Sequence, residues 1–287
     1  MANKKMVSVI IPTYHDWDRL ALCIEALKSQ TYPAETFEVI IVNNDPDDAA
    51  SELNLTENFQ LISESSPGSY AARNAGLAIA RGEIVAFTDS DCIPDKDWII
   101  NSVKHLEEGA ERLAGRVELF FKSKRHSISE IYEKAFSFDQ ELTASYGGAI
   151  TANMITWKKN FDIVGLFDSN LMSGGDNEWA GRAEAMGIKV VYAKDAIVYH
   201  PARDSIKDLI KKKRRVAAGL LRVNRLSILD ILAKGFFVNP SRAIRAYRIG
   251  RVSFFESLVS FFVLFFLKLV QTLEQLLLVL SLKKDER

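Results

Sequence analysis

Two carboxylates follow directly on an apolar run. Asp89 and Asp91 end the segment IVAFTDSD, whose first four residues are typical of a buried β-strand. In extended chain, residues two apart project to the same side, so both carboxylates can approach one cation. Such oxygens suit Mg²⁺ or Mn²⁺, which commonly keep waters and substrate phosphates as further ligands. The segment predicts a metal–diphosphate site, with a solvated turn as the alternative because Asp and Ser are ordinary turn residues.

A second group of charged residues follows two glycines. In GGDNEWAGRAEAMG, Asp176, Glu178 and Arg182 begin a helical pattern after a loop. A carboxylate in such a loop can take a proton as a general base. Asp176 can equally be a residue that caps the helix, and the spacing alone leaves both interpretations open.

The elements that must position these residues alternate between strand and helix. The apolar runs VSVIIPT, FEVIIVNN and FQLIS and the run before Asp89 are separated by segments with helical spacing, one of which ends at Gly82. Continuous apolar strands alternating with helices predict an α/β fold with a mainly parallel sheet covered on both faces. Ligands bind beyond the carboxyl ends of the strands in such sheets, which is where Asp89 and Asp91 lie.

The composition is that of a folded, intracellular protein. The chain has 287 residues, 48% hydrophobic and 26% charged, enough for a full core. Its two cysteines, Cys23 and Cys92, lie far apart without the spacing of a zinc site, so we expect neither a disulfide nor zinc. The N-terminal apolar run stops at Pro12 without a cleavage site and is expected to be a strand, not a signal peptide.

The formal net charge of zero hides an uneven distribution. Residues 201–287 carry 18 Lys/Arg and 7 Asp/Glu, a net charge of +11, and the residues before them carry 19 and 30, a net charge of −11. The two parts are expected to face different partners.

Four segments occur in an order and spacing that resemble one family. They are VSVIIPTY, FEVIIVNND, PGSYAARNAGLAIARGEIVAFTDSDC and GGDNEWAGRAEAMG. Together they resemble the family 2 glycosyltransferases of GT-A fold over roughly residues 7–200. The resemblance implies a GT-A domain at 1–203, with a mainly parallel mixed sheet flanked by helices. It also implies transfer of a sugar from a nucleotide sugar, a UDP-sugar being favoured, to a glycan or lipid-linked acceptor.

The resemblance also implies roles for residues at the donor. Pro12, Thr13 and Tyr14 would close the first strand against the nucleoside. Asn43 stands where the family usually has an aspartate that binds the base. An amide can both donate and accept there, so the contact can survive while the choice of base is put in doubt.

Further residues would complete the donor site and the metal site. Asp89 and Asp91 match the family's Asp-x-Asp, with Asp91 the expected ligand of Mn²⁺ or Mg²⁺ and Asp89 a ribose or metal contact. Arg73 could meet phosphate or lie on a helix surface. His200 could complete the metal shell, where imidazole suits Mn²⁺ better than Mg²⁺, or be structural. Asn153 lies at the centre of a segment that resembles the lining of the donor and acceptor pockets.

The family's usual Glu-Asp pair is altered in this chain. Counting back from Arg182 matches Asp176 to the catalytic aspartate and puts Gly175 in place of the glutamate. The resemblance implies that Asp176 is the base of an inverting transfer, with Glu178 in reserve, and that the metal stabilises the departing diphosphate.

Residues 204–287 change character. A basic segment, IKKKRRVAAGLLRVNR, precedes a long apolar run in which charges leave no uncharged stretch near the roughly 20 residues that a spanning helix needs. At helical spacing the polar residues of this run share one half of a helix opposite a wide apolar face; they are Glu256, Ser260, Lys268, Gln271, Glu274 and Gln275.

Such a basic helical segment with an amphipathic helix suits an anionic membrane surface. The helix could instead pack on its own domain or join two copies in a homo-oligomer. We expect a peripheral or monotopic enzyme at the cytoplasmic face of a membrane, with no nucleic-acid partner. A nucleotidyltransferase acting on a sugar phosphate, and a non-catalytic module that binds nucleotide sugars, are the alternative functions.

Overall fold

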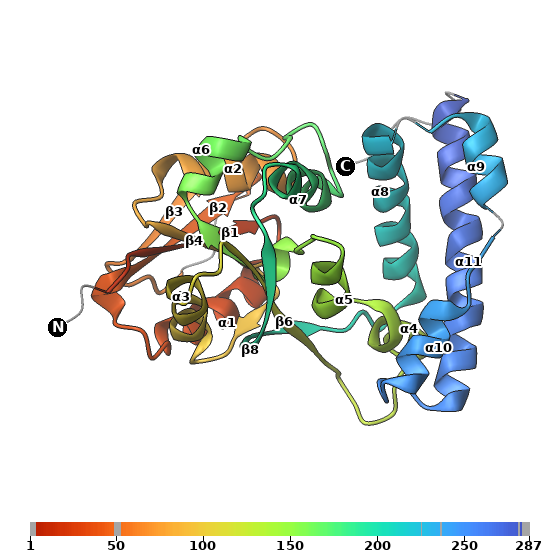
Figure 1. The fold of residues 1–287 in the computed structure, drawn as a ribbon, viewed down its shortest axis with the longest axis horizontal. Coiled ribbons are helices and arrows are strands. Elements are labelled where there is room, and N and C mark those ends of the chain that lie inside the picture. Colours follow the sequence, from red (N-terminus) through yellow and green to blue (C-terminus); the bar gives the residue numbers. More distant parts are fainter. Residues whose placement is uncertain (1–3, 49–52, 225, 236, 281, 283–287) are drawn as a thin grey trace. The chain divides into compact units, whose positions relative to one another are not determined.

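The computed structural model describes residues 4–48, 53–224, 226–235, 237–280 and 282 (Figure 1). The chain forms two compact units. The first contains Met1–Glu118, Asp139–Asn170 and Gly175–His200. The second contains Leu119–Phe138, Leu171–Gly174 and Pro201–Arg287. The units are therefore not consecutive segments, because the second also takes in two short stretches from the first two thirds of the chain.

A mixed sheet forms the centre of the first unit. In the described part of the chain it has eight strands in the order β3-β2-β1-β4-β7-β6-β8-β5. Strands β3, β2, β1 and β4 run parallel, β7 is antiparallel to β4 and β6, and β5 is antiparallel to β8. The strands are β1 (Val7–Thr13), β2 (Phe37–Asn43), β3 (Phe59–Ser63), β4 (Ile84–Phe87), β5 (Ile93–Pro94), β6 (Arg112–Phe120), β7 (Met154–Trp157) and β8 (Val190–Pro201). The predicted fold class is confirmed as a mixed sheet flanked by helices, in which the four neighbouring strands β3, β2, β1 and β4 are parallel.

Helices connect and flank these strands. The α-helices of the first unit are α1 (Trp17–Lys28), α2 (Ser69–Ile79), α3 (Trp98–Glu107), α5 (Gln140–Ser145), α6 (Lys159–Val164) and α7 (Gly175–Ala185), and the 3₁₀ turns are η1 (Ala34–Thr36) and η2 (Thr151–Asn153). In α1 the residues at helical spacing, Leu20, Ile24 and Leu27, are buried as predicted. Helix α2 lies close to β1, since a side-chain carbon at Gly76 would meet Ile10 at 2.6 Å. The start of α2 lies near the carboxyl end of the parallel strands because the helix follows β3 directly along the chain.

The central strands are buried on both faces. Every residue of β1, β2 and β4 is buried, which is what continuous apolar runs indicate in a parallel sheet. The carboxyl ends of these neighbours therefore open at one edge, where the chain turns polar.

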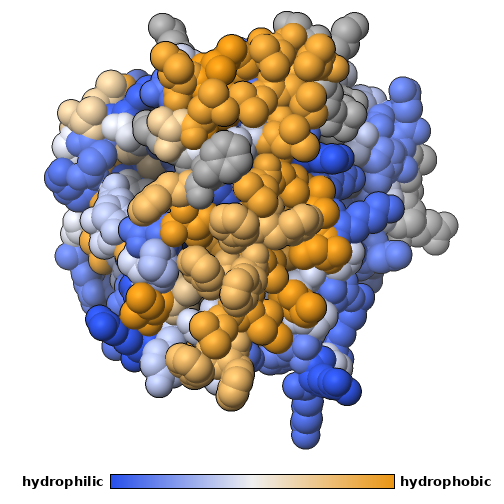
Figure 2. All heavy atoms as spheres, turned by 90° about the vertical axis from the view of Figure 1, so that its right-hand side faces the viewer, coloured by the Kyte–Doolittle hydropathy of each residue, from blue (hydrophilic) through white to orange (hydrophobic). Residues whose placement is uncertain are grey.

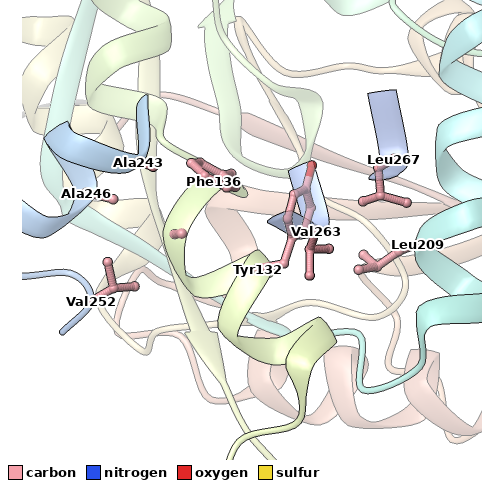
Figure 3. Packing of buried hydrophobic residues seen from close by; sticks show 9 residues of the cluster. Tyr132, Phe136, Leu209, Ala243, Ala246, Val252, Val263 and Leu267 are labelled. Carbon is pink, nitrogen blue, oxygen red and sulfur yellow. The ribbon is translucent and has the colours of Figure 1, made fainter. Parts of the chain in front are cut away.

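Helices make up most of the second unit. They are α4 (Ile128–Phe136), α8 (Ile206–Asn224), α9 (Ile228–Gly235), α10 (Ser241–Arg248) and α11 (Phe254–Val279). Their small core joins α4, α8, α10 and α11 (Figure 3); its members are Tyr132, Ala135, Phe136, Leu209, Ala243, Ala246, Val252, Val263 and Leu267. The predicted C-terminal helix is present.

A buried carboxylate connects α4 with α8. Glu133 is fully buried and accepts from Arg203 Nη1 at 3.0 Å, Lys212 Nζ at 3.2 Å and Ser137 Oγ at 2.7 Å. Burial by itself would raise the pKa of Glu133, but the two cations and the hydroxyl outweigh it and hold the pKa at about 2.

We expect this carboxylate to make stability depend on pH. Because the pKa of Glu133 is lowered in the folded state, its carboxylate stabilises the fold at pH values above the ordinary glutamate pKa of 4.5. This contribution to stability is lost as the pH falls towards about 2. Its full size is roughly 3 kcal/mol. Urea unfolding should therefore show Glu133→Gln well below wild type at pH 7 and the gap closing between about pH 4.5 and pH 2. Asp208→Asn, an exposed change in α8, is the control, and a gap that does not depend on pH would contradict the assignment.

Candidate functional site

The carboxyl ends of β1 and β2 form one side of the site. Asn44 N donates to Thr13 O at 2.9 Å, which extends the pairing of the two strands by one step. Pro12 and Thr13 are buried, whereas the Tyr14 side chain is 50% exposed. Of these three predicted donor contacts, Tyr14 is the one whose ring is open to a ligand.

Asn43 organises the loop that follows β2. Its Nδ2 donates to Asp45 O at 2.7 Å and to Asp48 O at 2.9 Å, and its Oδ1 accepts from Asp45 N at 3.1 Å. Both amide N–H groups are therefore used inside the protein. The residues that Asn43 holds carry half-buried carboxylates: Asp45 and Asp48 both contact the ring of His15.

The segment after β4 is a turn rather than extended chain. Cys92 N donates to Asp89 O at 3.1 Å, so the chain reverses between the two carboxylates. Asp89 accepts from Arg73 Nη2 at 2.5 Å, while Asp91 Oδ2 lies 3.4 Å from both Arg19 Nη1 and His200 Nε2. The expectation of extended chain between Asp89 and Asp91 is therefore wrong, and the two carboxylates have different partners in the structure.

Three potential metal ligands meet beside this turn. The ligand atoms of Asp91, Cys92 and His200 lie within 4.8 Å of one another, and no other such group occurs among the described residues. The register of β5 and β8 explains this, since Ile93 opposes Tyr199 and the next pair outward is Cys92 with His200. Cys92 was not predicted as a ligand, and its burial raises the pKa of its thiol.

This donor set fits a divalent cation. Asp91 supplies a carboxylate and His200 an imidazole, which together suit Mn²⁺ better than Mg²⁺. The Cys92 thiol stays protonated at neutral pH because burial raises its pKa, so it adds no charge to the set. Asp89 is not part of this group, because its carboxylate is bonded to Arg73.

Arg73 lies inside the protein. Its side chain is about 3% exposed, so the interpretation as a helix-surface arginine is wrong. The guanidinium bonds Asp89 and lies 5.6 Å from the centroid of the Tyr70 ring, one turn earlier on α2. Its Nε has no hydrogen-bond partner among the described residues.

The carboxylate of Asp176 is held at the start of α7. Asp176 is buried, and its Oδ1 accepts from Asn177 N at 2.9 Å and from the Tyr70 hydroxyl at 3.2 Å. Burial raises the pKa of Asp176 despite these hydrogen bonds and the nearby Arg73. A glycine precedes it for a steric reason, since a side-chain carbon at Gly175 would lie 2.8 Å from the Tyr70 ring.

Glu178 has a different environment. Its two oxygens accept from Arg182 Nε at 2.7 Å and Nη2 at 2.9 Å, one turn further along α7. Arg182 also donates to Val164 O and Leu166 O, which ties α7 to the loop after α6. Both oxygens of Glu178 are therefore engaged by an ion pair within its own helix.

Asn153 connects elements of the core. It is fully buried; its Oδ1 accepts from Trp98 Nε1 at 2.8 Å, and its Nδ2 donates to Arg116 O at 2.8 Å and Ala196 O at 2.9 Å. In this structure both N–H groups of Asn153 are used inside the protein and its side chain has no exposed surface.

Known proteins match most of the chain. The family model for glycosyl transferase family 2 matches residues 8–158. The chain belongs to this family. Among curated relatives, the glycosyltransferase AglE of Haloferax volcanii is 33% identical over 243 residues, covering 81% of this chain and 79% of that protein.

Two further proteins are similar to this glycosyltransferase. A dolichyl N-acetyl-α-D-glucosaminyl phosphate 3-β-D-2,3-diacetamido-2,3-dideoxy-β-D-glucuronosyltransferase of Methanococcus voltae is 23% identical over 80% of this chain and 78% of its own. The mannosyltransferase PcManGT of Pyrobaculum calidifontis, solved with GDP-Man and Mn²⁺, has a TM-score of 0.63 at 18% identity, covering 98% of this chain and 89% of that one. The fold of this glycosyltransferase is accordingly GT-A-like.

Two residues of this family 2 site were not predicted. Tyr70 lies 106 positions from Asp176 in sequence, and neither periodicity nor composition indicates that its hydroxyl reaches that carboxylate. Cys92 could have been found from its place beside Asp91, had the pairing of such a short strand as β5 been expected.

Proposed function

We propose that this glycosyltransferase moves a sugar from a nucleotide sugar, a UDP-sugar being favoured, to a lipid-linked or glycan acceptor with inversion at the anomeric carbon. The observation that supports this most is a set of contacts inside the first unit. Asp89 bonds Arg73, Arg73 lies against Tyr70, and Tyr70 bonds Asp176. A buried carboxylate with a raised pKa is thereby connected to the acidic turn at the end of β4.

In the proposed reaction Asp176 is the general base. Its carboxylate takes the proton from the acceptor hydroxyl as that oxygen attacks the anomeric carbon. A new carbon–oxygen bond forms on the face opposite the leaving group, and the bond between the anomeric carbon and the diphosphate breaks. The nucleoside diphosphate leaves with the bonding electrons. The raised pKa of Asp176 makes it a better base than an ordinary aspartate.

Tyr70 acts on Asp176 as a positioning residue in this proposal. Its hydroxyl donates to Oδ1, which fixes the carboxylate and leaves Oδ2 as the proton acceptor. Gly175 allows the ring to approach this closely. Glu178 stays the reserve base, with its ion pair to Arg182 as the argument against it.

Asp91 and His200 would hold the divalent cation, Mn²⁺ in preference to Mg²⁺. When bound, such a cation neutralises charge on the departing diphosphate. A solved structure of similar fold contains Mn²⁺ with a nucleotide sugar, which supports the same use here. Arg73 would add a positive charge near the phosphates, and Tyr14 and the loop held by Asn43 would contact the nucleoside.

The acceptor and the location are proposed together. The Methanococcus voltae relative acts, by its name, on a dolichyl phosphate-linked sugar, which supports a lipid-linked acceptor for this chain. We place the enzyme at the cytoplasmic face of a membrane as a peripheral or monotopic protein, with residues 1–203 as the catalytic part and 204–287 as the membrane-associating part. Family membership removes the support for a nucleotidyltransferase.

A donor and product assay tests this function. We expect one nucleotide sugar to raise the melting temperature of the protein, more so with Mn²⁺, because a ligand of the native state stabilises it. That donor should then glycosylate a lipid-phosphate-linked sugar, and NMR of the product should show an anomeric configuration opposite to that of the donor. A product with the configuration retained would contradict the role of Asp176, and no transfer from any donor would contradict the function.

A further inference from the structure

Helix α11 turns its polar side towards the interior of the second unit. Ser260 and Thr272 are almost fully buried, and the Thr272 hydroxyl donates to Gly235 O of α9 at 3.0 Å. Glu274 is 6% exposed and lies 3.5 Å from Arg214 of α8. Glu256, at the other end, accepts from Lys134 of α4 at 2.9 Å. Gln271 and Gln275 are buried on the same side.

The apolar side of α11 is turned outward. Phe255 is 78% exposed and Phe262 67%, which is unusual for phenylalanine in a soluble protein. We call the following set the apolar face: Leu229 and Leu232 of α9, Phe237, Ile244 and Tyr247 of α10, Ile249, and Phe254, Phe255, Leu258, Phe262, Phe265, Phe266 and Leu273 of α11, all at least partly exposed. Figure 2 shows apolar side chains gathered in a continuous band on this side of the helices.

Positive charge accompanies this face. On α10, Arg248 follows Ile244 by one turn and is exposed. Arg242 is also exposed, but its guanidinium donates to Phe136 O of α4 at 3.3 Å. The carboxylates of the described part of the unit are largely engaged: Glu133, Glu256 and Glu274 by Lys or Arg, and Asp204 by Lys122. The excess of Lys and Arg after residue 200 is therefore not neutralised by these carboxylates, and its positive charge can attract an anionic partner.

We infer that the apolar face inserts sideways into one leaflet of an anionic lipid bilayer, with α11 lying in the plane of the membrane. This inference rests on the proposed function in one respect, namely that the acceptor is linked to a lipid. The inward side of α11 carries polar residues together with Val263 and Leu267, while large apolar side chains such as Phe255 and Phe262 face outward, and an acyl boundary is a solvent that favours such an exposed apolar side. Anionic headgroups would meet Arg248 beside this face.

The packing of α11 argues against a spanning helix. The helix is long and apolar enough to cross a membrane by length and composition. Crossing, however, would carry Gln271, Glu274 and Gln275 into hydrocarbon and break the contacts with Arg214 and Gly235. Lying flat keeps those contacts and offers lipid a strip about 39 Å long, from 26 residues at about 1.5 Å each.

The packing of α11 excludes the alternative that its apolar side is covered by its own domain. A helix that packs on its own domain through its apolar side would bury Phe255 and Phe262 and expose Gln271, Glu274 and Gln275, which is the opposite of what is observed. A second copy of the chain is the remaining partner that could cover the apolar face. The experiment below distinguishes this outcome.

Co-sedimentation of the full-length protein with vesicles tests the inference. Vesicles of phosphatidylcholine with about one third phosphatidylglycerol should bind the protein, and pure phosphatidylcholine should bind it less well, because the charges contribute. The double variant Phe255→Ser, Phe262→Ser should lose at least about tenfold in vesicle affinity. Arg248→Gln should lower affinity for the anionic vesicles and weaken its dependence on salt. The matched control is Leu22→Ser with Ile163→Ser, which removes two exposed apolar side chains from the first unit and should change nothing.

Three results would overturn the inference. They are unchanged binding by the phenylalanine variant while its circular dichroism matches wild type, resistance of the bound wild type to alkaline extraction, and a concentration-dependent dimer in sedimentation that binds no vesicle. Transfer to a soluble acceptor separates this test from that of the enzyme. Sugar transfer to the soluble acceptor should persist in the phenylalanine variant. A wild-type protein that binds vesicles but transfers sugar from no donor would contradict the proposed function alone.

Discussion

Replacing Asp176 by asparagine is expected to lower turnover at least about a hundredfold while the affinity for the nucleotide sugar changes little. The amide keeps the size of the side chain and its Oδ1 can still accept from Tyr70, but it cannot take a proton from the acceptor hydroxyl. Loss of an interaction made only in the transition state lowers kcat without a matching change in ground-state binding. Turnover would be measured by product formation at saturating donor, and donor affinity by titration calorimetry.

Two companion variants make the assignment of the base sharper. Glu178→Gln should be milder, because Glu178 is already neutralised by Arg182. Tyr70→Phe keeps the ring and removes a hydrogen bond that lowers the pKa of Asp176. That pKa should therefore rise further, and the acid limb of the pH profile of kcat should move to higher pH. If Glu178→Gln proves more damaging than Asp176→Asn, the base is Glu178.

Replacing Asp91 by asparagine is expected to abolish the dependence of donor binding on Mn²⁺. Asp91 supplies the negative charge of the Asp91–Cys92–His200 group, since the Cys92 thiol is kept protonated by burial. The Asp91 side chain is partly exposed in a turn at the edge of the sheet, so the variant should fold. Titration of donor with and without Mn²⁺ would measure the loss, and the melting temperature would report the fold.

Asp95→Asn, a few residues further along the same segment, is the control for Asp91→Asn and should bind donor as wild type does. Donor affinity that still rises with Mn²⁺ in Asp91→Asn would assign the cation to other ligands. Asp89→Asn should act differently, because it removes the partner of the buried Arg73 and so threatens stability as well as binding.

The fold could be predicted because its main signal is local. Continuous apolar runs such as those of β1, β2 and β4 are what a doubly covered parallel sheet requires, so the sheet and its polar edge follow from the sequence. Helical spacing likewise predicts the two sides of α11. The direction in which each side faces does not follow, because it depends on partners in α4, α8 and α9.

The site was harder to predict because it depends on distant contacts. Asp89 and Asp91 could be found from their place after a strand, but their spacing did not predict the turn that the hydrogen bond from Cys92 N to Asp89 O closes. Asn43 and Asn153 were expected to meet ligand, whereas unpaired amides inside a protein are costly and both are used to hold loops and strands. Tyr70 was missed because only the folded chain brings it to Asp176.

The interleaving of the two units along the chain has a consequence for synthesis on the ribosome. Helix α4 belongs to the second unit, yet it is made before β7, α7 and β8, which complete the first. The cations that neutralise its Glu133 are Arg203 and Lys212, and its apolar partners in α10 and α11 come later still. Tyr132 and Phe136 therefore stay exposed while the first unit folds. Exposed apolar side chains are prone to associate with other chains. Access to a membrane or a chaperone during translation would shorten this exposure. No truncation at a single position separates one unit from the other.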